Sequence, residues 1–308
     1  MTHRPHARRL CMMTTAWHRW WCRNAPPHVM GVFRIAFGGF LLFYWGLRAP
    51  HVDMLFSDRG IVLPLLDQPA WLHTLLTPPP AWAAYTLYAA FMVALVCVTL
   101  GWGMRVAGLV ALAYNWYAWQ LSLHLLGASF DRLFAFVLLV VALSGADRIY
   151  ALRMRLRHGS WTAWEPVAIT AQRLIAVQIT LTYLGVGWQK VWLPDWKSGE
   201  VLAWGFIGRW ATPLGYWVAQ RNWPLWMYDA VVWQVKFVEC VMPFGFWLKG
   251  WRWVFFAWGL LFHGLIALLI SIWWFMVLIP AYIVFFSPEE FLAFLERRAP
   301  RLAGRRVQ

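Results

Sequence analysis

Long apolar runs, separated by short polar segments, follow one another along almost the whole chain. Eight of them are near the length that an α-helix needs to cross the hydrocarbon core of a bilayer, although the fourth and the eighth are short. The runs are His28–Arg48, Trp82–Trp102, Arg105–Leu126, Arg132–Ala146, Thr170–Leu193, Asp229–Leu248, Trp253–Ile272 and Trp274–Phe286. This pattern predicts an all-α integral membrane protein with a bundle of about eight transmembrane helices.

Two connections between these runs are long, and both are rich in Pro, Trp and Asp: Ala49–Ala81 and Pro194–Tyr228. We expect both to be external loops that pack over the bundle. Within the second, Val201–Gln220 is apolar but contains Gly, Pro213 and Arg209. It is therefore either an interfacial or re-entrant helix or a ninth span, and a ninth span would invert every segment after it.

Composition supports the membrane class, and the positions of the charges predict the orientation. Hydrophobic residues make up 61% of the chain and charged residues only 13%, and 26 residues are Trp, which gathers at membrane–water interfaces. A net charge of +14 would suit a nucleic-acid-binding protein, but the basic residues lie at the ends of apolar runs. If both termini are cytoplasmic, 17 of the 27 Lys and Arg residues face the cytoplasm. We therefore predict a multi-pass protein of the inner (plasma) membrane, with the lipid bilayer and not nucleic acid as its partner.

The same arrangement divides the chain into three parts. Residues 1–27 are a basic cytoplasmic or interfacial N-terminus, 28–286 the transmembrane bundle, and 287–308 a basic cytoplasmic tail. No cleavable signal-peptide pattern precedes Pro26, so we expect the first apolar run to remain in the mature protein. Met12 and Met13 are alternative start codons to Met1. The four cysteines form no C-x-x-C pair, so the sequence predicts neither a disulfide framework nor a thiolate metal site.

Ionisable residues within the apolar runs are the candidate functional residues, because charged side chains in a bilayer are rare and costly. An α-helix rises about 1.5 Å per residue, which gives each of them an approximate depth. Six are expected in the outer half of the membrane, provided that the spans pack together: His124, Asp131, Lys190, Lys236, Glu239 and His263. Arg34 and Arg173 lie toward the cytoplasmic ends and form a separate group.

Lys190, near the outer end of the fifth run, has two interpretations. Its ammonium can reach the interface while its apolar stem stays in hydrocarbon, which makes it an anchor. Alternatively, burial under the Trp-rich loop disfavours the ammonium and leaves some neutral amine to act as a base on an acidic hydroxyl or a quinol. Lys190 could instead act as a nucleophile that forms a Schiff base, but no neighbouring residue favours that role.

Glu239 has two predicted partners. Lys236 lies three residues earlier on the same helix, where it would form an intrahelical ion pair. His263 lies at a similar depth on the next helix, where the carboxylate would orient its imidazole. On its own, His263 would more often be a hydrogen-bonded core histidine. No His or carboxylate spacing predicts a metal site.

Four stretches of the chain together carry a resemblance to a known family. They read VFRIAFGGFLLF with the following LFSDRGIVLP, then ASFDRLFAFVLLVVALSGADRIYAL, then YLGVGWQKVWLPDWKSGE, and FVECVMPFG with LLFHGLIALL. In this order they resemble the horizontally transferred transmembrane (HTTM) domain family, whose best-known members are the vitamin K-dependent gamma-carboxylases. The resemblance implies that Lys190 matches the base that deprotonates the reduced quinone in those enzymes. Oxygen then converts the quinol to its epoxide, and the strong base so produced removes a proton from glutamate before carboxylation.

Two differences from the carboxylases limit what the resemblance implies. The animal enzymes have a large lumenal domain that helps to bind the substrate propeptide, whereas this sequence ends about twenty residues after its last predicted span. We therefore do not expect it to bind a substrate in that way. The stretch KVWLPDW also has a longer lysine-to-tryptophan spacing than the matching stretch of the carboxylases, so we expect a different loop after Lys190.

Two functions are therefore predicted. The first is a membrane enzyme that acts on a quinol or an exported peptide in the outer half of the bilayer. In this enzyme, Lys190 is the base, and Glu239 and His263 form a supporting pair. The resemblance implies a reduced quinone as the cofactor. The other supporting or substrate-binding residues are His124, Asp131 and Lys236. The second is a non-enzymatic membrane protein, either a maturation partner of a secreted peptide or a small-solute permease.

Overall fold

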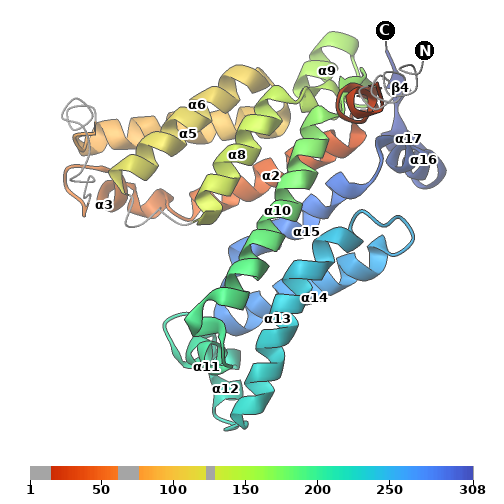
Figure 1. The fold of residues 1–308 in the computed structure, drawn as a ribbon. Coiled ribbons are helices and arrows are strands. Elements are labelled where there is room, and N and C mark those ends of the chain that lie inside the picture. Colours follow the sequence, from red (N-terminus) through yellow and green to blue (C-terminus); the bar gives the residue numbers. More distant parts are fainter. Residues whose placement is uncertain (1–14, 62–75, 123–128, 308) are drawn as a thin grey trace, which may run out of the picture. The chain divides into compact units, whose positions relative to one another are not determined.

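The computed structural model of the chain describes residues 15–61, 76–122 and 129–307. Helices joined by short connections make up most of these residues, and the only strands among them are four of two residues each (Figure 1). The predicted all-α class is therefore confirmed. The chain forms two compact units, one made of residues 1–174 and 286–308 and the other of residues 175–285.

The first unit is built around four helices that pack as successive neighbours, α2, α5, α6 and α8. Its described helices are α2 (His28–Gly46), a 3-10 turn (Ala49–His51), α3 (Val52–Phe56), α5 (Ala81–Leu100), α6 (Met104–Leu121), α8 (Ser129–Leu143), a second 3-10 turn (Ala146–Arg148), α9 (Leu152–His158), α16 (Pro288–Arg298) and α17 (Pro300–Ala303). Buried aromatic rings fill the space between α2, α5 and α6. The centroids of Trp45 and Phe91 lie 4.9 Å apart, and those of Phe91 and Tyr114 lie 4.6 Å apart.

The segments before α2 and after α16 pack within this same unit. Strand β1 (Asn24–Ala25) pairs antiparallel with β3 (Val167–Ala168), and β2 (Ala163–Trp164) pairs parallel with β4 (Arg305–Arg306). Arg23 binds Glu289 through both of its terminal nitrogens, and one of these bonds is 3.0 Å long. This guanidinium holds the pKa of the Glu289 carboxyl below its usual value. These contacts link residues 23–25 and 289–306 to the loop before α10.

The second unit contains the greater part of α10 (Thr170–Trp192) together with α13 (Leu225–Gly245) and α14 (Arg252–Ile270). Its shorter elements are a 3-10 turn (Pro194–Trp196), α11 (Glu200–Ile207), α12 (Pro213–Ala219), a 3-10 helix (Trp273–Val277), α15 (Leu278–Ala281) and a further 3-10 helix (Tyr282–Phe285). Figure 1 shows α13 and α14 side by side. Thr212 caps α12, accepting from the Gly215 N–H at 3.0 Å, and its hydroxyl donates to the Leu268 carbonyl at 2.5 Å near the end of α14.

Helices occupy seven of the eight predicted ranges, with ends shifted by a few residues. Among the described residues, three stretches are long and apolar enough to cross a membrane: His28–Phe56, α5 and α14. A fourth is added if Trp273–Phe285 and Pro288–Arg298, bent by 93°, count as one span. Helix α8 is shorter, at 15 residues, and α6, α10 and α13 carry more polar side chains. The structure therefore supports a membrane protein and confirms only part of the predicted eight-span bundle.

Two predicted segments differ in detail from the structure. Residues 273–285 alternate between 3-10 and α geometry and contain Pro280, so the eighth run is not a regular α-helix. Residues 200–220 form α11 and α12, of eight and seven residues. At about 1.5 Å per residue, neither helix approaches the roughly 30 Å of a hydrocarbon core, so a continuous ninth span is excluded.

Candidate functional site

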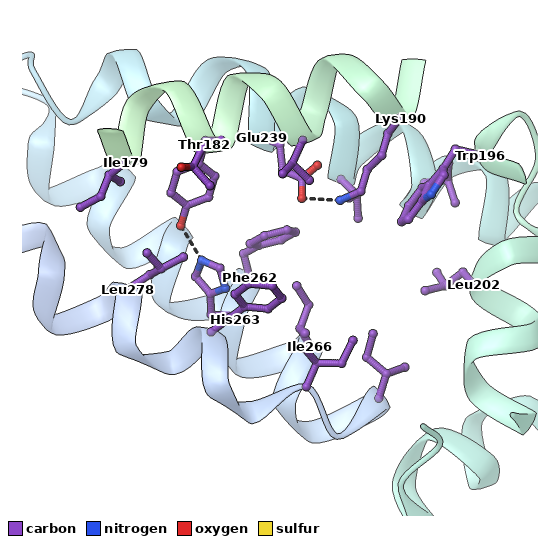
Figure 2. A pocket seen from close by; sticks show the side chains of 17 residues that line it. Ile179, Thr182, Lys190, Trp196, Leu202, Glu239, Phe262, His263, Ile266 and Leu278 are labelled. Carbon is purple, nitrogen blue, oxygen red and sulfur yellow. Dashed lines mark hydrogen bonds and ion pairs between the residues drawn. The ribbon is translucent and has the colours of Figure 1, made fainter. Parts of the chain in front are cut away.

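A cavity of about 230 Å³ lies within the second unit, between α10, α13 and α14 (Figure 2). Its walls are mostly aliphatic and aromatic side chains, including Ile179, Val186, Leu202, Val232, Val235, Phe262, Ile266, Ile270, Phe275 and Leu278. The charged or imidazole side chains on the wall are Lys190, Glu239 and His263, and the wall also includes the hydroxyl groups of Thr182 and Tyr183. Three of the six residues predicted to lie together therefore line one cavity.

A close contact between two helices brings Lys190 to Glu239. Gly187 lies one turn before Lys190 on α10, and a Cβ atom added there would lie 2.9 Å from both Glu239 Cβ and Cys240 Sγ. Only a residue without a side chain allows α10 to approach α13 this closely. At this contact, Lys190 Nζ donates a hydrogen bond to Glu239 Oε1.

The Lys190–Glu239 ion pair is largely shielded from solvent, with the two side chains 14% and 7% exposed. The Lys190 ammonium also lies 4.5 Å from the centre of the Trp196 ring, within range of a cation–π contact. Lys190 therefore has a carboxylate and an aromatic ring as partners inside the unit. The interpretation of Lys190 as an anchor that extends outward to the interface does not match this geometry.

Neither partner predicted for Glu239 is the one that the structure shows. Glu239 pairs with Lys190, and its second oxygen, Oε2, is buried with no hydrogen-bond partner among the described residues. Both wrong predictions came from depth and spacing along the helices, which carry no information on how the helices are rotated. The rotation of α10 and α13 decides which side chains meet.

Lys236 faces the loop that follows α10. Its Nζ donates to the Trp196 carbonyl at 2.6 Å and lies 4.3 Å from the centre of the Trp233 ring. Nearby, Asp229 Oδ1 accepts from the Gly199 N–H at 2.5 Å. Both contacts tie residues 196–199 to α13, so Lys236 helps to hold Trp196 beside Lys190.

His263 is the first of three linked side chains. Its Nε2 is hydrogen-bonded to the Tyr183 hydroxyl, which is 2.8 Å from the Tyr282 hydroxyl. The other ring nitrogen, Nδ1, is buried without a partner among the residues the structure describes. Neither tyrosine was predicted from the sequence, because an uncharged hydroxyl in an apolar run does not stand out as a charged side chain does. Tyr183 precedes Lys190 by seven residues, two helical turns, and this spacing on one face of α10 was an available signal.

Of the remaining two predicted residues, Asp131 does not line this cavity. Asp131 belongs to the first unit, where its Oδ1 accepts from the Tyr44 hydroxyl at 2.8 Å. Arg48 in turn donates to that hydroxyl, also at 2.8 Å. His124 lies outside the described residues. Within the described ranges, no three His, Cys, Asp or Glu side chains are grouped so that they could hold a metal ion.

The comparison with protein families identifies the chain. The family model of the HTTM domain matches residues 22–290, which include every helix that lines the cavity. This chain belongs to the HTTM domain family. No curated protein and no solved structure matches it. The family match and the apolar helices together indicate that the HTTM protein is a membrane protein.

The Gly187 contact gives a prediction for the HTTM protein. Gly187→Ala is expected to destabilise it by about 1–3 kcal/mol, the usual effect of overpacking, because the new methyl group must push α10 from α13 and lengthen the Lys190–Glu239 contact. Gly185→Ala is the matched control, since no atom lies within 4 Å of a Cβ added there. In the control, the higher helix propensity of alanine should leave stability unchanged or raised by up to about 1 kcal/mol. Thermal unfolding in detergent measures both, and equal effects would contradict the close contact.

Proposed function

We propose that this HTTM protein is a membrane enzyme that removes a proton from an acidic hydroxyl of a lipid-soluble substrate, with Lys190 as the base. The observation that carries the proposal is the Lys190–Glu239 pair on an apolar cavity wall with Glu239 Oε2 unpartnered. Buried polar atoms nearly always have a partner. A substrate group in the cavity supplies the missing one.

The Lys190–Glu239 pair is suited to accept a proton because one proton can lie on either the lysine nitrogen or the glutamate oxygen. In the charged form, Lys190 is an ammonium and Glu239 a carboxylate; in the neutral form, Glu239 holds the proton and Lys190 is an amine. In the neutral form, the nitrogen of Lys190 has a free electron pair that can take a proton. The Lys190 amine then accepts the substrate proton and becomes an ammonium. That positive charge stabilises the substrate oxyanion left in the cavity.

A reduced quinone suits this cavity as a substrate. An engineered apolar cavity of about 150 Å³ binds benzene, so 230 Å³ accommodates a ring head group but not a folded peptide. When bound, a quinol supplies an acidic phenolic hydroxyl and, after its deprotonation, electrons for oxygen. The chain's own residues hold the ring between aliphatic walls and present Lys190 and Glu239 to the hydroxyl.

We also propose that all eight predicted segments cross the inner membrane, with both termini in the cytoplasm. Helices α6, α10 and α13, with 18, 23 and 21 residues, have the length of a span despite their polar side chains. In residues 273–285, the 3-10 stretches rise about 2.0 Å per residue, so this short segment covers more of the bilayer than an α-helix of equal length. An even number of spans agrees with the basic residues at both ends of the chain.

The experiment uses the full chain in liposomes with 1,4-dihydroxynaphthalene, the reduced form of 1,4-naphthoquinone, and records oxygen uptake above that of protein-free liposomes. Lys190→Ala and Lys190→Arg are both expected to lose activity by about a hundredfold or more, the contribution typical of a general base. Arginine keeps the charge but supplies no neutral nitrogen at ordinary pH. Lys197→Ala, an exposed lysine on the adjoining loop, is the control and should keep wild-type activity.

Full oxygen uptake by folded Lys190→Arg protein would contradict the role of Lys190 as the base. A purely positive group would then suffice, and the pair would have an electrostatic or structural role.

A further inference from the structure

The cavity has a second unpartnered polar atom, on a different helix from the first. Glu239 Oε2 on α13 and His263 Nδ1 on α14 are both buried without hydrogen-bond partners among the described residues, and the two residues are only 5% and 3% exposed. Both residues line the cavity, and Figure 2 shows them at separate places on its wall. A hydroxyl at the Lys190–Glu239 pair satisfies only one of these atoms.

Packing holds the His263 imidazole in place. Its ring centroid lies 5.1 Å from that of Phe262 and 5.8 Å from that of Tyr183. Gly259, one turn earlier on α14, leaves room for Tyr282, since a Cβ added there would lie 2.8 Å from Tyr282 Cζ. The sequence thus places the Tyr282 hydroxyl against α14 and within 2.8 Å of the Tyr183 hydroxyl.

The hydrogen bonds that link Tyr282, Tyr183 and His263 can run in either of two directions. In the first, Tyr282 donates to Tyr183 and Tyr183 donates to His263 Nε2, which leaves the proton of the imidazole on Nδ1 as a donor. In the second, His263 Nε2 donates to Tyr183 and Tyr183 donates to Tyr282, which leaves Nδ1 as an acceptor. Both directions use the same atoms, so reversing the hydroxyl protons and the histidine tautomer changes what Nδ1 offers to a ligand.

We infer that His263 Nδ1 binds a second oxygen of the substrate, and that Tyr183 and Tyr282 position the imidazole so that it can accept from a hydroxyl or donate to a carbonyl or oxyanion. The inference rests on the proposed function, since it takes the cavity as the substrate site, and it deepens it by naming the ligand class. That class is an aromatic ring with oxygen atoms at both ends. One oxygen lies at the Lys190–Glu239 pair and the other at His263, in the reduced and the oxidised form alike.

Binding of a matched ligand series to the full chain in detergent, without oxygen and without turnover, tests the inference. The ligands are 1,4-dihydroxynaphthalene, with two hydroxyls, and 1-naphthol, with one, and calorimetry measures both affinities. We expect the wild type to prefer the two-hydroxyl ligand by about tenfold, the effect of one buried hydrogen bond. In His263→Phe the preference should fall to within about twofold.

Three further variants separate recognition from general damage. His263→Asn, which keeps a polar atom near the position of Nδ1, should retain part of the preference. Tyr183→Phe should reduce it, because the imidazole loses the hydroxyl that directs it. Tyr216→Phe, on the exposed face of α12, is the control and should leave it unchanged.

An undiminished preference in His263→Phe would overturn the inference, as would no preference, or no binding of either ligand, in the wild type. The result is independent of the assignment of the base. If Lys190→Arg keeps its oxygen uptake while the preference still depends on His263, the base assignment fails and the second binding point stands. If Lys190→Arg is inactive and His263→Phe keeps the preference, the base assignment stands and the second binding point fails.

Discussion

The double variant Lys190→Met/Glu239→Leu is expected to fold at least as stably as the wild type and to have no quinol-dependent oxygen uptake. Replacing a buried ion pair with apolar residues of similar volume is often neutral or stabilising by about 1–4 kcal/mol, because neither charge then has to leave water. The walls around the pair are already apolar, with Val186, Val232 and Val235 among them. The new side chains therefore meet a matching surface.

The single variants should behave differently. Glu239→Leu leaves the Lys190 ammonium without its carboxylate, and Lys190→Met leaves the Glu239 carboxylate without its ammonium; each is expected to lose about 3–5 kcal/mol. Thermal unfolding of all four proteins in one detergent gives the comparison. If the double variant is as unstable as the singles, the pair is needed for the fold, and its presence in the cavity no longer indicates catalysis.

Arg34→Met is expected to prevent the first unit from folding. The Arg34 side chain is fully buried and donates only to backbone carbonyls in the contacts described: those of Val98, Thr99, Ala146, Ile149 and Tyr150. The bond to Tyr150 is 2.8 Å and that to Val98 is 3.1 Å. The guanidinium thus joins α2 to the end of α5 and to the segment after α8. The Val98 carbonyl also accepts from the Gly101 N–H and keeps that bond. Each of the other carbonyls left buried without a donor costs about 1–3 kcal/mol, and their sum approaches the stability of an ordinary domain, about 5–15 kcal/mol.

Two related variants distinguish the loss of the Arg34 hydrogen bonds from the loss of its charge. Arg34→Lys keeps the charge but concentrates its donors on one nitrogen, so it should recover only part of the stability, because one ammonium cannot reach carbonyls spread around a planar fork. Arg105→Met, at an exposed position at the start of α6, removes the same charge and should change stability by less than about 0.5 kcal/mol. The yield and thermal unfolding of the detergent-purified proteins measure both. A stable Arg34→Met protein would contradict the role of these bonds.

The helices could be predicted from the sequence because hydrophobic length alone marks where a chain can be helical in a membrane. His28–Arg48 and Trp82–Trp102 were predicted, and α2 and α5 occupy His28–Gly46 and Ala81–Leu100. The segment around Pro280 shows the limit of this signal. Hydropathy does not distinguish an α-helix from a 3-10 helix, whereas the missing N–H of a proline changes the hydrogen bonding locally.

The candidate site could be predicted only in part. Depth along the helices predicted that Lys190, Glu239 and His263 share the outer half of the membrane, and all three line the cavity. The pairing of Glu239 could not be found in this way, because it depends on helix rotation and on the close approach at Gly187. Tyr183 and Tyr282 were not predicted from the sequence, because an uncharged hydroxyl in an apolar run gives no signal comparable to that of a charged side chain. Tyr183 is hydrogen-bonded to His263, 80 positions away, and Tyr282 is hydrogen-bonded to Tyr183, so both depend on contacts between distant parts of the chain.

The role of Lys190 is tested most directly by chemical rescue of Lys190→Ala. Removal of the side chain leaves space beside Glu239 for a small amine, which can then accept the substrate proton in place of Lys190. Ethylamine should restore oxygen uptake with 1,4-dihydroxynaphthalene, in proportion to the concentration of its neutral form, while tetramethylammonium, which has charge but no basic nitrogen, should restore none. Rescue by both compounds alike, or no rescue in a variant that still binds the ligand as the wild type does, would contradict the assignment of Lys190 as the base.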